Sequence, residues 1–375
     1  MTTTGTRSLK GLRRGNKEAV LFLLMRGGEM SRVRIASRTG LTTASVTQLV
    51  KDLIAENLVS ESGEVVRNSS GRRETLLKFE GNSVAAIGVN IESDRTHISA
   101  CTWDEVLREE VYPTAELFAE GTGKLNERIR ELTKLCEGRK FVGTGIAVVG
   151  IADEENGISV KSYGIFPDGY RLAEEVAEGT GTHVEIINNV RAQARALMTG
   201  NEDSFMLVKH APGVGCAVIS DCSVVAGAAN RAGEIGHTVV KEGGELCRCG
   251  KRGCLEAYVS EKHISALYRE KTGNEMPICE IYDAYGKDVV VTEILDGCLD
   301  LLAVSIGNAA MLLNPVRVIA TGGIFSREPL FYAFCKAVEK AGFGGAFALS
   351  RVGDDKKLKA FSGARHVILS RVFGV

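Results

Sequence analysis

The chain contains 375 residues, 44% of them hydrophobic and 25% charged, which is typical of a globular protein with two or three domains. No apolar run is long enough to cross a bilayer, and no apolar signal segment follows the basic N-terminus. These features argue against a membrane-spanning or secreted protein. We therefore expect a cytoplasmic protein with no membrane partner.

The charge is unevenly distributed along the chain. Residues 1–80 contain 14 basic and 8 acidic residues, a net charge of +6, whereas the whole chain carries −1, which leaves −7 for residues 81–375. A basic segment joined to an acidic remainder indicates that the basic segment meets a polyanion. A charged surface without a nucleic-acid partner is the alternative.

Residues 15–61 carry the pattern of three helices. Val20, Leu23 and Leu24 belong to the apolar stripe of the first helix, which the glycines of RGG bring to an end. The segment MSRVRIASRTG predicts a short second helix that closes at Gly40.

The segment LTTASVTQLVKDLIAENLV predicts the third helix. Thr42 or Thr43 can cap its N-terminus, and its apolar residues recur three, four and seven positions after Val46. Its early exposed positions are small or hydrogen-bonding, as suits a helix that enters the major groove of DNA. These positions are Thr43, Ala44, Ser45, Thr47 and Gln48.

The pattern changes after the third helix. Leu58-Val59 and Val65-Val66 predict two short strands around a turn, and a third strand is expected at 75–79, after the loop NSSGRR. Arg72 and Arg73 on that loop suit phosphates or a narrow minor groove. The order of the elements predicts a winged helix-turn-helix DNA-binding domain in residues 1–80. A protein-interaction module with a basic hairpin is the alternative.

From about residue 84 the chain predicts α/β structure. We expect hairpins at 84–104 and 204–228, with glycines at the bend of the second. Residues 183–200 predict a strand, an Asn-Asn corner and a helix, and residues 314–331 predict a strand, a glycine turn and a helix.

The most specific motif is GEIGHTVVKEGGELCRCGKRGCLE, residues 233–256. Together with the order of the elements, this motif resembles the ROK family (repressor, open reading frame, kinase). The resemblance covers nearly the whole chain. It implies an α/β fold of the actin-like ATPase (sugar kinase) type, with two lobes that follow an N-terminal winged helix-turn-helix. We expect the lobes at 81–190 and 191–375, with a zinc loop at 237–254.

The clustered thiols suit a metal ion. His237, Cys247, Cys249 and Cys254 supply one imidazole and three thiolates, a set that fits a closed, structural Zn²⁺ site. A disulfide is disfavoured in the cytosol, and the cluster contains no Cys-x-x-Cys redox pair. The other seven cysteines are expected to be buried, small hydrophobic residues.

The resemblance also implies a sugar pocket next to the zinc loop. In ROK kinases the residues that match Glu234, His237 and Glu256 hydrogen-bond to sugar hydroxyls, and Asn188 and Asn189 match the pair that meets the reacting hydroxyl. Carboxylates buried in this way confer selectivity. For the two glutamates, a supporting contact to the zinc site is the alternative.

Two departures from the kinase pattern stand out. ROK kinases begin with a phosphate-binding turn of the type Asp-x-Gly-Gly-Thr, whereas this chain has NIESDRT from Asn90, whose two carboxylates would repel a nucleotide. At Asn189 an amide stands where those kinases carry the catalytic aspartate, and an amide cannot act as a general base. The second phosphate turn, HAPGVG, is altered as well, and only TGGIF at 321–325 is close to the pattern.

The sequence therefore predicts a transcriptional regulator rather than an enzyme. Its partners would be double-stranded DNA and a sugar or sugar derivative, and it would act as a homodimer or homotetramer that represses carbohydrate genes. Two alternatives remain. One is a sugar kinase with an added DNA-binding head, and the other is a DNA-binding protein whose body only dimerises.

Overall fold

A computed structural model describes residues 9–66, 73–198, 204–352 and 355–374. These residues form two compact units. Unit 1 contains the N-terminal head, the first lobe and, from Lys359 onward, the C-terminal segment. Unit 2 contains residues 193–195 and the chain from 204 to Leu358.

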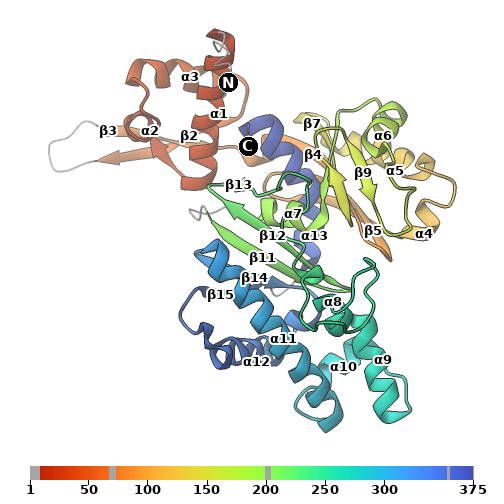
Figure 1. Ribbon diagram of the computed structural model, residues 1–375. Helices are drawn as coiled ribbons and strands as arrows, with labels where there is room; N and C mark the ends of the chain where they lie inside the picture. Colours follow the sequence, from red (N-terminus) through yellow and green to blue (C-terminus); the bar gives the residue numbers. More distant parts are fainter. Residues whose placement is uncertain (1–8, 67–72, 199–203, 353–354, 375) are drawn as a thin grey trace, which may run out of the picture. The chain divides into compact units, whose positions relative to one another are not determined.

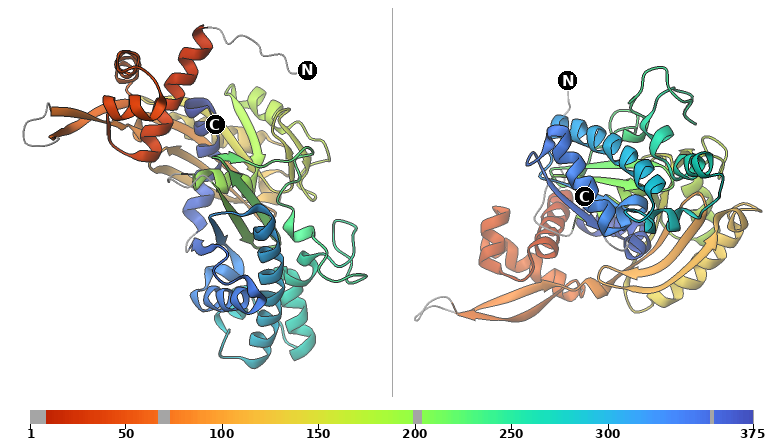
Figure 2. Two further views of the ribbon diagram at one scale, coloured as in Figure 1. Left: turned by 60° about the vertical axis from the view of Figure 1, so that its left-hand side comes forward. Right: turned by 90° about the horizontal axis from the view of Figure 1, so that it is seen from below.

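The head consists of three helices and a small antiparallel sheet in the order β1-β3-β2. Figures 1 and 2 show β2 and β3 extending as a ribbon beyond the helices, as expected of a wing. The elements are α1 (Leu9–Gly27), β1 (Met30–Ser31), α2 (Arg32–Thr39), α3 (Thr43–Ala55), β2 (Val59–Val66) and β3 (Arg73–Phe79).

Local sequence explains the helix boundaries of the head. Ser31 caps α2 by accepting the Arg34 N–H, and Gly40 ends that helix in the left-handed conformation. Thr42 caps α3 by accepting the Ser45 N–H at 3.1 Å. The three helix predictions are therefore confirmed, and the apolar face of α3 that begins at Val46 is buried.

The strand prediction for the wing needs correction. Leu58-Val59 and Val65-Val66 do not form two strands around a turn, because β2 runs continuously through 59–66. A register shift between Glu61 and Gly63 accommodates the intervening SESG segment without a break in the pairing with β3.

The first lobe contains a five-stranded sheet in the order β10-β7-β4-β5-β6. Helices α5 and α6 cover one face of it, and the expected hairpin of β4 and β5 is confirmed. The elements are η1 (Gly81–Ser83), β4 (Val84–Ile91), β5 (Arg95–Thr102), β6 (Val106–Pro113), α4 (Thr114–Leu117), α5 (Gly123–Thr133), η2 (Lys134–Cys136), β7 (Lys140–Val148), β8 (Ile151–Asp153), β9 (Ile158–Lys161), α6 (Leu172–Thr180), β10 (Val184–Asn188) and α7 (Asn189–Ala196).

The C-terminal segment, α13 (Asp355–Ile368) and η6 (Leu369–Phe373), packs on the other face of the first-lobe sheet. Its close approach depends on glycines, since a Cβ on Gly145 would lie 1.9 Å from the Gly363 carbonyl oxygen. The Phe373 ring then lies 5.2 Å from that of Phe79. Residues 359–374 therefore group with unit 1, which corrects the expectation that they belong to the second lobe.

Unit 2 is built on a five-stranded sheet in the order β13-β12-β11-β14-β15. Its main core lies between this sheet and the helices α8 to α12. The elements are β11 (Phe205–His210), β12 (Val214–Ser220), β13 (Ser223–Val224), η3 (Ile235–His237), α8 (Leu255–Val259), α9 (Glu261–Thr272), α10 (Ile278–Asp283), α11 (Val289–Leu313), β14 (Arg317–Thr321), η4 (Gly323–Ser326), α12 (Glu328–Val338), η5 (Glu339–Phe343) and β15 (Ala348–Val352). Within the described ranges, no helix has both the length and the apolar character needed to cross a membrane.

Candidate functional site

The predicted recognition helix is α3. Thr43, Ser45 and Gln48 are exposed on it, and Thr47 is half-buried. The Thr47 hydroxyl donates to the Thr43 carbonyl at 2.8 Å, and the Ser45 hydroxyl lies 2.9 Å from that of Thr42. Both hydroxyls keep free lone pairs, so the N-terminal half of α3 presents hydrogen-bonding groups to the solvent.

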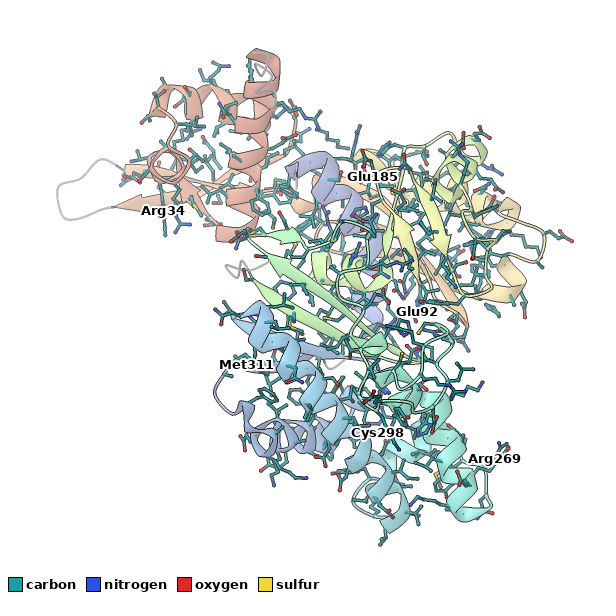
Figure 3. The ribbon with its side chains drawn as sticks, viewed as in Figure 1. Arg34, Glu92, Glu185, Arg269, Cys298 and Met311 are labelled. Atoms are coloured by element: carbon teal, nitrogen blue, oxygen red, sulfur yellow. The ribbon has the colours of Figure 1, made fainter. Side chains whose placement is uncertain are left out.

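Of the two predicted wing arginines, only Arg73 lies within the described residues. Arg73 is exposed at the start of β3 and forms an ion pair with Glu64 at 3.3 Å. Arg72 lies outside the described residues. Arg34 and Arg38 are exposed on α2 and were not among the DNA contacts predicted from the sequence; Arg34 is labelled in Figure 3. A charged residue repeated at i and i+4 on a short helix before α3 was the available signal.

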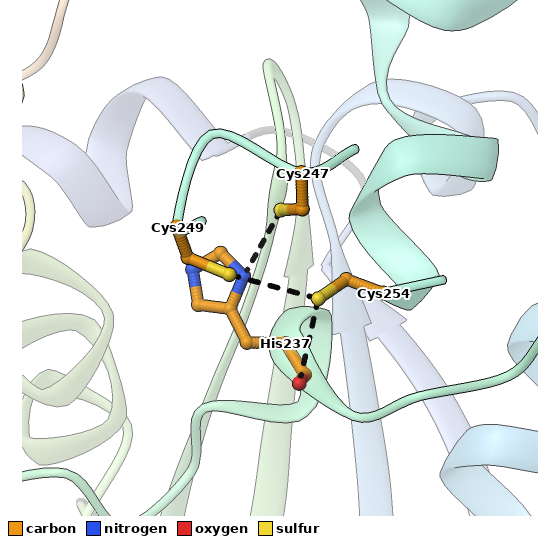
Figure 4. Close-up of side chains that lie close together, drawn as sticks. All are labelled: His237, Cys247, Cys249 and Cys254. Atoms are coloured by element: carbon orange, nitrogen blue, oxygen red, sulfur yellow. Dashed lines mark hydrogen bonds between the residues drawn. The ribbon is translucent and has the colours of Figure 1, made fainter. Parts of the chain in front are cut away.

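The four predicted metal ligands lie together in unit 2. Their ligand atoms are all within 4.8 Å of one another (Figure 4). The Cys247 Sγ lies 3.6 Å from the His237 Nδ1, and the Cys249 Sγ lies 3.6 Å from the Cys254 Sγ. These separations are close to the edge lengths of a tetrahedron with metal bonds of about 2.0–2.3 Å. They are far too long for a disulfide.

The surroundings of the cluster affect the charge of its thiols and the orientation of its imidazole. Burial, and then hydrogen bonding to the neighbouring thiols, raises the pKa of Cys254 to about 12. A bound metal would reverse this effect by stabilising the thiolate. The Glu234 carboxylate lies 3.7 Å from the His237 Nε2, so it can orient the imidazole whose Nδ1 faces the thiols. Lys251 donates to the His237 carbonyl at 2.7 Å and fixes the loop from its other side.

Glu256 is held tightly beside the metal cluster. Its buried carboxylate accepts the Arg248 Nε at 2.7 Å and the Arg248 Nη2 at 3.2 Å. It also accepts the Val214 N–H at 3.0 Å, and a Cβ on Gly213 would lie only 2.1 Å from it. Glu256 thereby connects the cysteine loop to the β11–β12 turn. The sequence did not indicate that Arg248, which lies between two of the cysteines, pairs with Glu256.

Asn188 and Asn189 belong to unit 1, at the junction of β10 and α7. The Asn188 side chain accepts the N–H groups of Val190 and Arg191 at 2.9 and 3.1 Å. It also donates to the Gly150 carbonyl at 2.7 Å, so its amide serves as a cap for α7. The predicted ligand residues thus fall into two sets, with Glu234, His237 and Glu256 in unit 2.

The turn that follows β4 carries an internal ion pair. Glu92, labelled in Figure 3, lies 3.3 Å from the Lys359 Nζ of α13, and both side chains are largely buried. Asn90 is only 1% exposed, and neither polar atom of its side chain has a hydrogen-bond partner in the described part of the chain. A carboxylate that is already paired with lysine occupies a turn where small residues would be needed to admit phosphate.

In unit 2, the turn that follows β11 is the HAPGVG turn, and His210 lies at its start, at the end of β11. Its Nε2 donates to the Val259 carbonyl at 2.7 Å, and its Nδ1 accepts the Ile324 N–H at 3.3 Å. The buried, neutral imidazole therefore uses a backbone N–H of the TGGIF turn. A Cβ on Gly323 would lie 2.2 Å from this ring. Nothing in the sequence pattern indicated this contact, which joins segments about a hundred residues apart.

The environment of His210 predicts a pH effect on stability. Burial lowers the pKa of His210 from 6.5 to about 4, although the bond to the Val259 carbonyl acts in the opposite direction. The unfolded chain therefore binds more protons than the folded chain between these two values. This contribution to stability is complete above pH 6.5 and is lost as the pH falls toward 4, by at most about 1.4 kcal/mol per pH unit. His210→Gln removes this titration. As the pH is lowered from 6.5 toward 4, the urea midpoint of unfolding should therefore decrease less steeply for the variant than for the native protein. Equal slopes for both proteins would contradict the prediction.

Comparison with known proteins agrees with this geometry. The model of the ROK family matches residues 87–349. The chain belongs to the ROK family. The expectation from the 233–256 motif is thereby confirmed, and so is the expected actin-like, sugar-kinase type of body.

Two similar proteins are regulators. The chain is 25% identical over 327 residues to the xylose repressor of Bacillus subtilis (strain 168), covering 84% of each chain. It is 26% identical over 337 residues to the DNA-binding transcriptional dual regulator NagC of Escherichia coli (strain K12), covering 82% of this chain and 80% of NagC. Both alignments extend over most of each protein.

Solved structures of ROK proteins share the fold. A ROK family transcriptional regulator described as a homolog of the E. coli MLC protein superposes with a TM-score of 0.80 at 19% identity, covering 96% of this chain and 98% of that one. The ROK hexokinase from Thermus thermophilus gives a TM-score of 0.66 at 20% identity, covering 76% of this chain and 98% of that one. The kinase similarity covers a smaller share of this chain than the regulator similarity does.

Proposed function

We propose that this ROK protein is a sequence-specific DNA-binding transcriptional regulator, most simply a repressor of carbohydrate genes, whose body binds a sugar-like effector. The observation that carries the proposal is the head, with a capped recognition helix and a wing, on a ROK body. The two regulators among its relatives, one a xylose repressor, support the same assignment.

The body is proposed to have no kinase activity. Phosphoryl transfer depends on positioning and charge stabilisation of the nucleotide, together with a group that accepts the substrate proton. Asn189 cannot accept that proton. The pair of Glu92 with Lys359 and the buried His210 each occupy a turn that a nucleotide would need. Three independent features thus oppose catalysis.

A coupled assay with ATP, Mg²⁺ and a panel of sugars tests this part of the proposal. We expect no sugar to raise ATP consumption above the background without sugar. We also expect Asn189→Asp alone to restore no turnover, because the two altered turns remain. Sugar-dependent phosphate transfer by the native protein would support the kinase alternative instead.

The metal is proposed to be a structural Zn²⁺ held by His237, Cys247, Cys249 and Cys254. Three thiolates and one imidazole leave no open position for substrate. The ion would fix the loop on which Arg248 holds Glu256. Asn188, Asn189, Glu234, His237 and Glu256 remain the proposed effector contacts.

The proposed DNA contacts are Thr43, Ser45, Thr47 and Gln48 on α3, with Arg72 and Arg73 on the wing. A homodimer or homotetramer would present two heads to a two-fold symmetric operator. The direct test is fluorescence anisotropy with DNA from upstream of the gene, at physiological salt and with excess random competitor. Binding that survives the competitor is expected, and binding no tighter than to random DNA would contradict the proposal for that site.

A further inference from the structure

A chain of three side chains links α1 to the exposed face of α3. The Gln48 Nε2 donates to the Asp52 Oδ1 at 3.2 Å, one helical turn away on α3. The other oxygen of Asp52 accepts the Arg13 Nη2 of α1 at 2.5 Å. Gln48 is exposed, whereas the Asp52 side chain is only 30% exposed.

The chemistry of the pair fixes the orientation of the Gln48 amide. An ionised carboxylate only accepts hydrogen bonds, so the amide nitrogen must face Asp52. Hydrogen bonding from Arg13 holds the pKa of Asp52 below its usual value and keeps the carboxylate ionised. One N–H of Gln48 is therefore engaged. The amide oxygen and the second N–H remain as an acceptor and a donor side by side.

This remaining edge matches one base better than the others. In the major groove adenine presents the N7 acceptor next to the N6 donor, and a glutamine amide can bind both at once. Guanine presents two acceptors, which would place its O6 against the amide oxygen. Cytosine offers a single donor, and thymine offers an acceptor and a methyl group.

We propose that Gln48 reads an adenine in the DNA site and that Asp52, braced by Arg13, is the positioning residue that selects adenine over guanine. The inference rests on the proposed DNA-binding function. Without Asp52 the amide can rotate and turn its nitrogen toward guanine. Arg13 has a second effect, because it offsets the charge of an acid on a helix that faces phosphates.

A neighbouring ion pair provides a matched control. Lys17 of α1 pairs with Glu56 just after α3, so it braces the same two helices one turn further along. Glu56 also lies 3.5 Å from Lys140, and none of its described contacts involves Gln48. Glu56→Gln therefore removes a brace between α1 and α3 and leaves the Gln48 amide in place.

The test is selection of DNA from a randomised duplex library by four full-length proteins: the native chain, Gln48→Ala, Asp52→Ala and Glu56→Gln. The native protein should select a site in which one position favours adenine over guanine by about tenfold or more. Gln48→Ala should lose the preference at that position only. Asp52→Ala should reduce the adenine-to-guanine ratio there several-fold, and Glu56→Gln should keep the native site.

A fifth protein, the variant Gln48→Glu, separates base reading from a folding defect. Gln48→Glu presents only acceptors, so it should move the preference at the same position from adenine to cytosine. The inference would be overturned if Gln48→Ala left every base preference unchanged. It would also be overturned if the position whose preference depends on Gln48 favoured a base other than adenine. An Asp52→Ala site identical to the native one would overturn the role of Asp52. Failure of the native protein to enrich any site would instead overturn the proposed function itself.

Discussion

Cys254→Ser is expected to abolish metal binding. The Cys254 thiol is fully buried, comes directly before α8 and lies 3.6 Å from the Cys249 Sγ. A serine hydroxyl is a poor ligand for Zn²⁺ at neutral pH, and structural sites require their thiolates. Without the ion, the loop from His237 to Cys254 loses its main constraint.

The consequence extends beyond the loop. Glu256 follows Cys254 by two residues, and Arg248 is placed by the ligands on either side of it. We therefore expect Cys254→Ser to hold less than about a tenth of the native zinc. Trypsin should cleave it faster after Lys251 or Arg252. Metal content by mass spectrometry and limited proteolysis measure both effects.

Cys279→Ser is the matched control for this experiment. Cys279 is exposed on α10 and does not belong to the metal cluster. Native zinc content and proteolysis are expected for this variant. Full zinc in Cys254→Ser, or a native protein purified without any bound metal, would contradict the metal assignment.

The second large effect is expected in DNA binding. Replacing Thr47 and Gln48 together by alanine should weaken binding to the specific site by roughly 10- to 100-fold, because a good bidentate base contact contributes about 1–3 kcal/mol. Neither residue is charged. The slope of affinity against salt concentration should therefore stay close to the native value, and binding to random DNA should change little.

Two further variants make this result interpretable. Arg73→Ala should weaken binding to all sequences and lower the salt slope by about one, as expected for a phosphate contact. Tyr332→Ala, at a side chain that is 61% exposed in unit 2, should bind like the native protein. If the double variant keeps full affinity, α3 is not the recognition helix.

The sequence predicted those parts of the fold that depend on local periodicity. The helices of the head follow from apolar spacing and from Ser31, Gly40 and Thr42 at their ends. The hairpin of β4 and β5 follows from two apolar runs around a charged turn. The metal cluster was predictable because its ligands have distinctive chemistry and lie within eighteen residues of sequence.

Contacts between distant segments were not predictable in this way. The return of α13 to unit 1 depends on Gly145 and Gly363, which carry no periodic signal. The continuous strand β2 was missed because a serine- and glycine-rich stretch suggests a turn, whereas pairing with β3 absorbs it as an irregularity. Four cysteines were correctly expected to be buried, but Cys279 is exposed, and Cys222 and Cys335 are only partly buried.

In the candidate site, too, the sequence indicated residues but not the contacts that hold them. The resemblance to ROK kinases indicated Glu256, but not that Arg248 and the Val214 N–H hold its carboxylate. Likewise, Asn188 was predicted as a ligand contact, and the structure adds its role as a cap. An effector hydroxyl that reaches Glu256 must share this carboxylate with Arg248. That sharing offers a route from effector binding to movement of the cysteine loop.

The affinity of the purified protein for its selected DNA site, with and without sugar, tests the central claim most directly. The probes are a panel of pentoses, hexoses and N-acetylated hexosamines. We expect tight binding that resists competitor DNA and changes at least about tenfold with one class of sugar, a coupling of about 1.4 kcal/mol. Specific binding that no sugar alters would contradict the effector role of the body and leave it only a platform for assembly.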